Sequence, residues 1–148
     1  MSGIKWWLRI VGVLYVLEGG GLTAMALSAP GMFAEVWSSA PAGTLAEAAV
    51  RGIKLAGLPG VLTWLLLGVL MLLFSRAPAR ARVLVIVVAA WELLVWLPVD
   101  FIASLNGFEV PRAVTLMAIH LAIGISAALL LRRTANGADR AIEPANAR

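Results

Sequence analysis

Four ionisable side chains stand inside long apolar stretches of this sequence: Glu18, Glu92, Asp100 and His120. If those stretches are membrane helices, each such group costs roughly 2.5–3.5 kcal/mol near the bilayer centre, so each needs a reason to be there. A rise of about 1.5 Å per residue places Glu18 and Glu92 near mid-membrane and Asp100 in the outer third. His120 falls roughly 10 Å from the outer face. These depths allow Glu18 to meet Glu92, and Asp100 to meet His120.

The excess of acids over histidine decides which chemistry this group could perform. Two adjacent carboxylates in a low dielectric cannot both stay ionised, so we expect Glu18 or Glu92 to hold a proton, or the two to share one. A group of this kind suits a proton carrier, a cation site or a polar clamp on a ligand. The same glutamates could also serve only as hydrogen-bonded contacts between helices.

Structural roles are equally open for the other two ionisable groups. Asp100 could pair with Lys54 or Arg112, whose long side chains can reach along the helix surface. His120 could be a packed, hydrogen-bonded side chain. A single imidazole with carboxylates at different depths is weak ground for a metal site, and the absence of cysteine excludes thiolate sites and disulfides. We therefore expect neither a metal nor a cofactor.

Aromatic side chains accompany these groups at helical spacing. Tyr15 shares a face with Glu18, and Trp96 shares one with Glu92. Asp100 lies about 80° from Glu92 by helical rotation, and Pro98 is expected to bend the helix between the two acids. The candidate ligand or proton site therefore comprises Glu18, Glu92, Asp100, His120, Trp64, Trp96 and Tyr15.

Small residues mark the faces on which these helices could pack closely. One stripe comprises Gly20, Ala24 and Ser28, a second comprises His120, Gly124 and Ala128, and a third comprises Gly57, Gly60, Trp64 and Gly68. Small residues three or four apart let membrane helices approach one another. The second stripe therefore predicts that the histidine faces protein rather than lipid, and the third leaves room beside the indole for its ring or for a ligand.

The elements that must position these residues follow from composition. The chain has 148 residues, of which 61% are hydrophobic and 14% charged, with a mean hydropathy of +0.94. That balance excludes a soluble enzyme, a disordered chain and a coiled coil. An apolar helix of about 20 residues crosses a bilayer, and four stretches qualify: Trp6–Ser28, Ile53–Phe74, Val83–Leu105 and Ala113–Leu131. The sequence predicts an all-α, integral membrane bundle of four transmembrane helices.

Basic residues predict the orientation of this bundle. Nine of the twelve Lys and Arg residues lie on one side of the predicted bundle. Two are at the start of the first span, three lie between the second and third spans, and four follow the fourth span. Since basic residues collect on the cytoplasmic side, both termini are expected to be cytoplasmic. The net charge of +4 then reflects topology and attraction to anionic lipid, and we expect no nucleic-acid partner.

Two segments lie outside the spans. The outer loop between the first two spans begins with an apolar stretch, Pro30 to Trp37, which predicts a short helix lying in the membrane interface with Trp37 at headgroup level. The polar C-terminal stretch predicts a disordered cytoplasmic tail. We therefore divide the chain into a four-helix transmembrane domain, 1–133, and a tail, 134–148.

Several short strings resemble the BphX-like family of small bacterial membrane proteins. They are Lys5-Trp6-Trp7-Leu8-Arg9-Ile10-Val11-Gly12, Pro30-Gly31-Met32-Phe33-Ala34-Glu35, Ser75-Arg76-Ala77-Pro78-Ala79-Arg80 ahead of Val83-Leu84-Val85, and His120-Leu121-Ala122-Ile123-Gly124. The resemblance spans most of residues 5–133 and implies a four-span protein of the bacterial inner membrane, often encoded near aromatic-ring degradation enzymes. It assigns no catalytic residue.

Four functions fit these observations. The first is a non-enzymatic protein that binds a lipophilic small molecule, such as an aromatic compound, or helps to move it. Such a protein could equally be an accessory subunit near aromatic-degradation enzymes. The second is a membrane enzyme of sterol-isomerase-like architecture that uses buried acids. The third is a proton-coupled small exporter, and the fourth is a structural subunit of a homo-oligomer or larger membrane complex. In each case the lipid bilayer is the first partner.

Overall fold

The computed structural model describes residues 2–105 and 109–142, all of whose regular structure is helical. The helices are α1 (Ser2–Ser28), α2 (Pro30–Ser38), α3 (Glu47–Phe74), α4 (Pro78–Trp91), the π-helical segment η1 (Glu92–Trp96), α5 (Leu97–Leu105) and α6 (Val110–Ile142). The segments α4, η1 and α5 follow one another without a break, so they form one long rod. The described residues thus form four long rods and one short helix.

Each long rod contains a stretch apolar enough to cross a bilayer, which confirms the four expected spans. The stretches are Gly3–Ser28, Glu47–Phe74, Ala79–Leu105 and Val110–Ala135. The helices extend beyond the predicted spans because hydropathy identifies the lipid-facing part of a helix rather than its hydrogen-bonded ends. α6 continues to Ile142, so residues 134–142, expected to be disordered, are helical; residues 143–148 lie outside the described residues. The division into a membrane domain and a tail stays a prediction.

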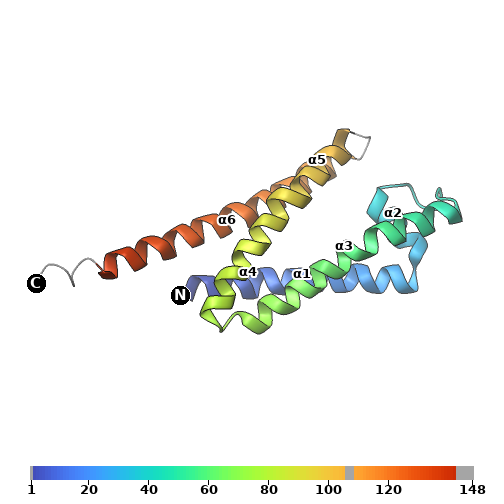
Figure 1. The fold of residues 1–148 in the computed structure, drawn as a ribbon. Helices are drawn as coiled ribbons and strands as arrows, with labels where there is room; N and C mark the ends of the chain where they lie inside the picture. Colours follow the sequence, from blue (N-terminus) through green and yellow to red (C-terminus); the bar gives the residue numbers. More distant parts are fainter. Residues whose placement is uncertain (1, 106–108, 143–148) are drawn as a thin grey trace, which may run out of the picture.

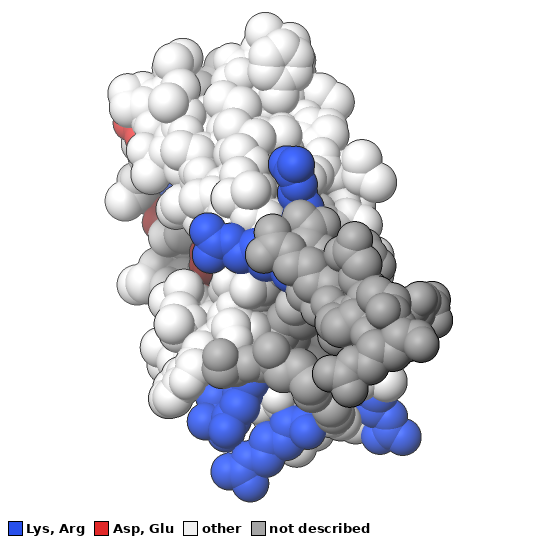
Figure 2. Space-filling model, turned by 90° about the vertical axis from the view of Figure 1, so that its left-hand side faces the viewer, with Lys and Arg blue, Asp and Glu red and all other residues white. Residues whose placement is uncertain are grey.

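The rods form two arms that diverge (Figure 1). α1 and α3 run side by side as one arm, with α2 packed on both. The rod α4–η1–α5 and α6 form the other arm, and α4 also contacts α1 and α3. The arms meet at the end that carries the N-terminus and the α3–α4 turn, and they separate toward α2 and the α5–α6 connection. Lys and Arg side chains gather at the closed end, which Figure 2 shows.

Glycines set the close approach of α1 and α3. A Cβ on Gly68 would lie 2.8 Å from the Val16 nitrogen, and one on Gly19 would lie 2.6 Å from the Leu65 nitrogen. The contact therefore runs through Gly19 and Gly68, and through Gly12 next to Gly68.

Two of the expected small-residue stripes differ in register from the observed faces. The stripe of Gly20, Ala24 and Ser28 does not make the α1–α3 contact, because Ala24 and Ser28 are exposed. On α6, His120 and Gly124 are buried as expected, but Ala127 is buried in place of Ala128. The buried residues of α6 are thus spaced by four and then three positions, and this spacing keeps them on one face of a straight helix.

The short helix α2 lies where the sequence predicted one. Pro30 occupies its first turn, where the missing N–H costs nothing, and Ser39 ends it in the left-handed conformation with φ 56°. Phe33 and Ala34 are fully buried, and the ring of Phe33 stacks on Trp37 with centroids 5.6 Å apart. α2 is therefore packed on the bundle by its own apolar face.

The π-helical segment η1 was not expected from the sequence. The Leu97 N–H donates to the Glu92 carbonyl, five residues back instead of four. Pro98 follows directly; it has no N–H, and its ring collides with the carbonyl four residues before it in a regular α-helix. A wider turn relieves that collision, so the disturbance expected from Pro98 takes the form of a π turn placed between Glu92 and Asp100.

Candidate functional site

The buried ionisable groups converge on His120. Its Nδ1 contacts Glu92 Oε2, and its Nε2 lies 2.9 Å from Asp100 Oδ2. All three residues are buried, with exposed fractions of 1% for Glu92, 7% for Asp100 and 5% for His120. The expected meeting of Asp100 with His120 is confirmed. Glu92 directs its carboxylate to the same imidazole, and no hydrogen bond joins it to Glu18 among the described residues, so the expected meeting of the two glutamates is not what the structure shows.

The π turn explains how both acids reach one ring. Eight ordinary helical steps from Glu92 to Asp100 rotate by two turns plus about 80°, which would point the two side chains to different faces. A π turn holds one extra residue, so the rotation is close to that of seven steps, and the two acids come within about 20° of one face. The expected 80° offset is therefore wrong, because η1 absorbs it. His120 on α6 then spans the two helical turns that separate the acids.

Glu92, His120 and Asp100 form a group that we call the triad. The imidazole contacts one carboxyl group on each of its ring nitrogens. Because both nitrogens are engaged in this way, a proton held in either contact lies between the ring and one of these two acids. The single histidine is therefore occupied by Glu92 and Asp100.

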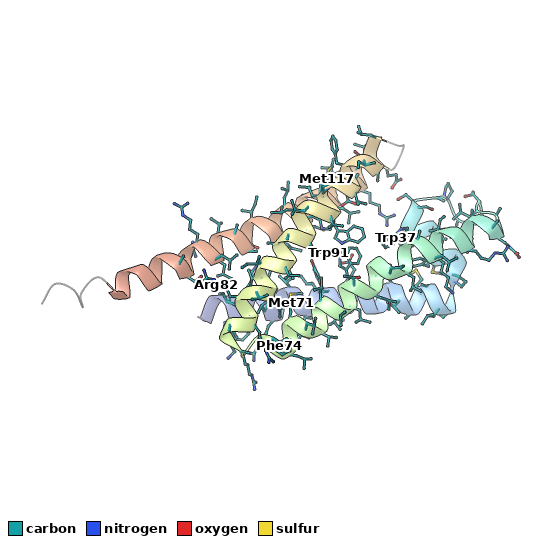
Figure 3. The ribbon with its side chains drawn as sticks, in the orientation of Figure 1. Trp37, Met71, Phe74, Arg82, Trp91 and Met117 are labelled. Carbon is teal, nitrogen blue, oxygen red and sulfur yellow. The ribbon has the colours of Figure 1, made fainter. Side chains whose placement is uncertain are left out.

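Next to the triad, tryptophans from three elements pack together. The Trp64 and Trp96 ring centroids lie 4.5 Å apart, and Trp37 lies 6.3 Å from Trp64 and 6.0 Å from Trp96. Trp96 also stacks on the His120 ring at 6.2 Å, with an interplanar angle of 18°. Figure 3 shows Trp37 and Trp91 on the inner sides of the two arms. The aromatic cluster thus bridges α2, α3 and η1 and ends at the imidazole of the triad.

Trp37 is a site residue that the sequence interpretation missed. It was expected to anchor α2 at headgroup level, but its half-buried ring packs on Trp64 and Trp96. Glycines make the room: a Cβ on Gly57 would lie 2.9 Å from the Trp37 ring, and one on Gly60 3.3 Å from that of Trp96. The predicted space beside Trp64 is therefore filled by two other indoles. The four-residue spacing from Phe33 to Trp37, which places both rings on one face of a helix, was the signal available.

A cavity of about 490 Å³ lies between the arms, beside the triad and the tryptophans. Its wall is mostly apolar, and it is lined by Leu17, Glu18, Gly21, Leu22, Met25, Val36, Trp37, Trp64, Trp96, Val99, Asp100, Ala103, Arg112, Leu116 and His120. The volume is in the range of pockets that hold drug-sized molecules. Both arms and α2 contribute residues to the wall. In the described part of the chain α1 and α5 make no close backbone approach to each other, although both line the cavity.

Two ionisable side chains flank the cavity apart from the triad. Glu18 on α1 lines it with an exposed side chain and lies close enough to His120 for an electrostatic interaction. Arg112, at the start of α6, donates to Ser39 Oγ at 2.9 Å and to the Val36 carbonyl at 2.6 Å. These bonds connect the second arm to the C-terminal end of α2, where unpaired helix carbonyls favour a cation.

Tyr15 differs from the other candidate residues. It is buried between α1 and α3, where its Cβ would lie 2.9 Å from a Cβ on Gly68, and it is not part of the cavity wall. Its hydroxyl has no hydrogen-bond partner among the described residues. Of the seven candidate residues, five line the cavity, Glu92 is bonded behind its wall, and Tyr15 belongs to the packing of α1 on α3.

No protein-family model, curated protein or solved structure matches this chain. Within the described ranges, 2–105 and 109–142, no group of three or more His, Cys, Asp or Glu side chains is arranged to hold a metal ion. The chemistry of the site therefore has to be argued from its own geometry.

Proposed function

We propose that this protein is a multi-pass membrane protein, with both termini in the cytoplasm, that binds a lipophilic small molecule in the cavity between its two arms. One observation carries the proposal: an apolar and aromatic cavity of about 490 Å³ ends at the buried His120, whose ring nitrogens contact Glu92 and Asp100. Pockets of that volume with a few converging polar groups are the usual form of small-molecule sites. The BphX-like resemblance, a bacterial inner-membrane location and a link to aromatic compounds belong to the same proposal.

Entry from the lipid phase fits this arrangement. The arms separate at the end away from the α3–α4 turn, and α1 and α5 line the cavity without packing on each other in the described part of the chain. A lipophilic compound concentrates in the bilayer, so an opening between these helices exposes the cavity to its most concentrated source. α2 covers the outer end through Val36 and Trp37, held there by Arg112.

A cavity-filling substitution tests the proposal. Gly21 lines the cavity, and a Cβ built on it meets no atom within 4 Å, so we expect the ring of Gly21→Phe to occupy space at the cavity wall without displacing the backbone. Gly52→Phe is the matched control, because Gly52 is equally unobstructed but is not part of the wall. Native mass spectrometry of the nanodisc-embedded protein would be run with the neutral probe 2-neopentylnaphthalene. We expect one bound probe in the parent and Gly52→Phe, and none in Gly21→Phe.

Equal probe binding by all three proteins would place the probe outside the cavity and overturn the proposal. Absence of binding by the parent would overturn it for this class of compound. A fixed stoichiometric protein partner retained in the same spectra would favour a structural subunit instead.

A membrane enzyme of the isomerase type is the second candidate, and the triad favours it. Asp100 lines the cavity and contacts His120 through Oδ2, so its other carboxyl oxygen can exchange a proton with a bound molecule while His120 and Glu92 share the charge. An isomerase that moves a double bond removes a proton at one carbon and returns one at another. A retained compound that acquires carbon-bound deuterium after incubation in D₂O, and does not with His120→Gln, would favour this function over simple binding.

A further inference from the structure

The charges around the cavity can be assigned element by element. Its wall contains Glu18 from α1, Asp100 from α5, and His120 and Arg112 from α6, with Glu92 of η1 bonded to the imidazole. The described wall residues of α2 and α3 are not titratable. Glu35, the acid of α2, accepts a hydrogen bond from the Gly43 N–H at 2.5 Å, in the loop that follows α2.

Glu18 differs from the other two acids of this group in its partners. Glu92 and Asp100 each contact a nitrogen of His120, and Arg112 donates to Ser39 and to the Val36 carbonyl. Glu18 has no hydrogen-bond donor among the described residues, and its side chain is exposed and lines the cavity. An unpaired carboxylate in a low-dielectric site is strongly disfavoured, so Glu18 needs either a proton or a bound cation there.

The remaining wall suits an organic cation. Trp37, Trp64 and Trp96 come together within 6.3 Å between centroids. Indole rings attract cations, and all three rings line the cavity, where Trp64 and Trp96 also pack on each other and Trp96 on His120. Leu17, Leu22 and Leu116 surround the rest of the volume. A small hydrated metal ion finds few oxygen ligands on such a wall, whereas an ammonium group on an apolar body matches both parts of it.

We propose that the ligand is a lipophilic monovalent organic cation with Glu18 as its counter-ion. This rests on the proposed binding function. Cation entry releases the proton of Glu18: the O–H bond breaks, the electron pair stays on the carboxylate, and the proton passes to water. The site therefore exchanges one proton for one monovalent cation, and the net charge of the cavity stays constant. Higher pH favours the cation and lower pH favours the protonated, empty site.

A pair of probes that differ only in charge tests this. The cation is (2-naphthylmethyl)trimethylammonium, and the neutral probe is 2-neopentylnaphthalene, in which carbon replaces the ammonium nitrogen. Both would be titrated into the nanodisc-embedded protein and followed by native mass spectrometry. We expect the parent to bind the cation roughly tenfold or more tightly than the neutral probe, with the preference growing as pH rises. A weakly buffered solution should acquire one proton per bound cation.

Charge-removing variants assign the effect to one residue. Glu18→Gln should lose the preference for the cation and the proton release while still binding the neutral probe, which also shows that it is folded. Glu47→Gln is the control, because Glu47 is an exposed acid at the start of α3 outside the cavity wall. It should behave as the parent. Glu18→Asp, which keeps the acid, should keep the preference.

The outcomes separate this inference from the binding function. Equal affinity for both probes in the parent overturns the cation assignment and leaves the binding function standing. Cation preference without proton release, or one that survives Glu18→Gln, overturns the role of Glu18. Binding of neither probe overturns the binding function itself. The cation assignment is decided by the selectivity of the parent protein alone, so it is tested even if one variant fails to fold.

Discussion

Three consecutive glycines of α1 offer a matched test of how closely α1 and α3 approach. A Cβ on Gly19 would lie 2.6 Å from the Leu65 nitrogen and 3.1 Å from the Val61 carbonyl oxygen. A Cβ on Gly20 would lie 3.9 Å from a methyl group of Leu65, and one on Gly21 would meet nothing within 4 Å. The same substitution, Gly→Ala, is therefore expected to have opposite effects at neighbouring positions.

The magnitude follows from these distances. Non-bonded atoms pack best at about 3.5–4.0 Å, so Gly19→Ala must separate α1 and α3 by roughly 1 Å. The obstructing atoms belong to the α3 backbone and cannot rotate aside as a side chain can. Overpacking of this kind costs about 1–3 kcal/mol. Replacing a mid-helix glycine by alanine recovers only about 0.5–1 kcal/mol, so Gly19→Ala is expected to be destabilising overall, while Gly20→Ala is neutral or stabilising.

The assay is unfolding of the detergent-solubilised protein, by heat and by titration with a denaturing detergent, followed by circular dichroism. Gly19→Ala should lower both midpoints, whereas Gly20→Ala and Gly21→Ala should match or exceed the parent. If Gly19→Ala and Gly20→Ala have the same unfolding midpoints, then α1 and α3 do not approach through Gly19. The position of Glu18, one residue earlier on the same helix, would then have to be reconsidered.

Three further changes are expected to have distinct effects. Arg112→Met removes two charge-assisted hydrogen bonds to the C-terminal end of α2, worth about 1.5–3 kcal/mol each, so amide hydrogen exchange should rise in α2 and stay unchanged in α3. Glu92→Ala leaves the buried His120 nitrogen without its partner and opens a hole, so it should lower the melting midpoint more than Glu92→Gln, which retains an acceptor; equal midpoints would contradict the contact. An alkaline phosphatase fused after Arg133 should be inactive and one inserted near Ala42 active, and the reverse would overturn the orientation.

Hydropathy predicted the four spans because membrane insertion depends on a property that is additive along the chain. Each predicted span lies within a helix that the structure contains, and α2 follows Pro30 as expected. Helix ends were less predictable, as α6 shows by continuing to Ile142. Polar residues can extend a helix that has already left the bilayer, and hydropathy gives no signal for where such an extension stops.

The packing faces were predicted less well, because several glycine registers are compatible with one sequence. Gly19 and Gly20 are adjacent in α1, yet only Gly19 meets the backbone of α3. The choice between them depends on the rotation of one helix against the other, a property of the pair that the α1 sequence alone does not contain. The same holds for Ala127 and Ala128 on α6.

The convergence of the ionisable site residues was predicted for one pair, Asp100 with His120, but not for Glu92 with the same ring. Glu92, Asp100 and His120 were identified because ionisable groups are costly in lipid, and their meeting depended on a helix rotation that assumed regular geometry. The π turn changes that rotation, and Pro98 was its only sequence signal. Trp37 was missed for a different reason: a tryptophan near a membrane surface suits an interface anchor as well as it suits a cavity wall.

The π turn and the triad depend on each other. A π turn gives up regular hydrogen bonding, which the bilayer cannot compensate with water, so it needs a gain elsewhere. That gain is the placement of Glu92 and Asp100 on one face, where a single imidazole joins them and replaces two isolated buried acids by one hydrogen-bonded group. With the histidine engaged on both nitrogens, it has no nitrogen left to hydrogen-bond Glu18 on α1. The carboxyl group left facing the cavity is thus a consequence of how the second arm satisfies its own acids, and it is what makes the space between the arms suited to a cation.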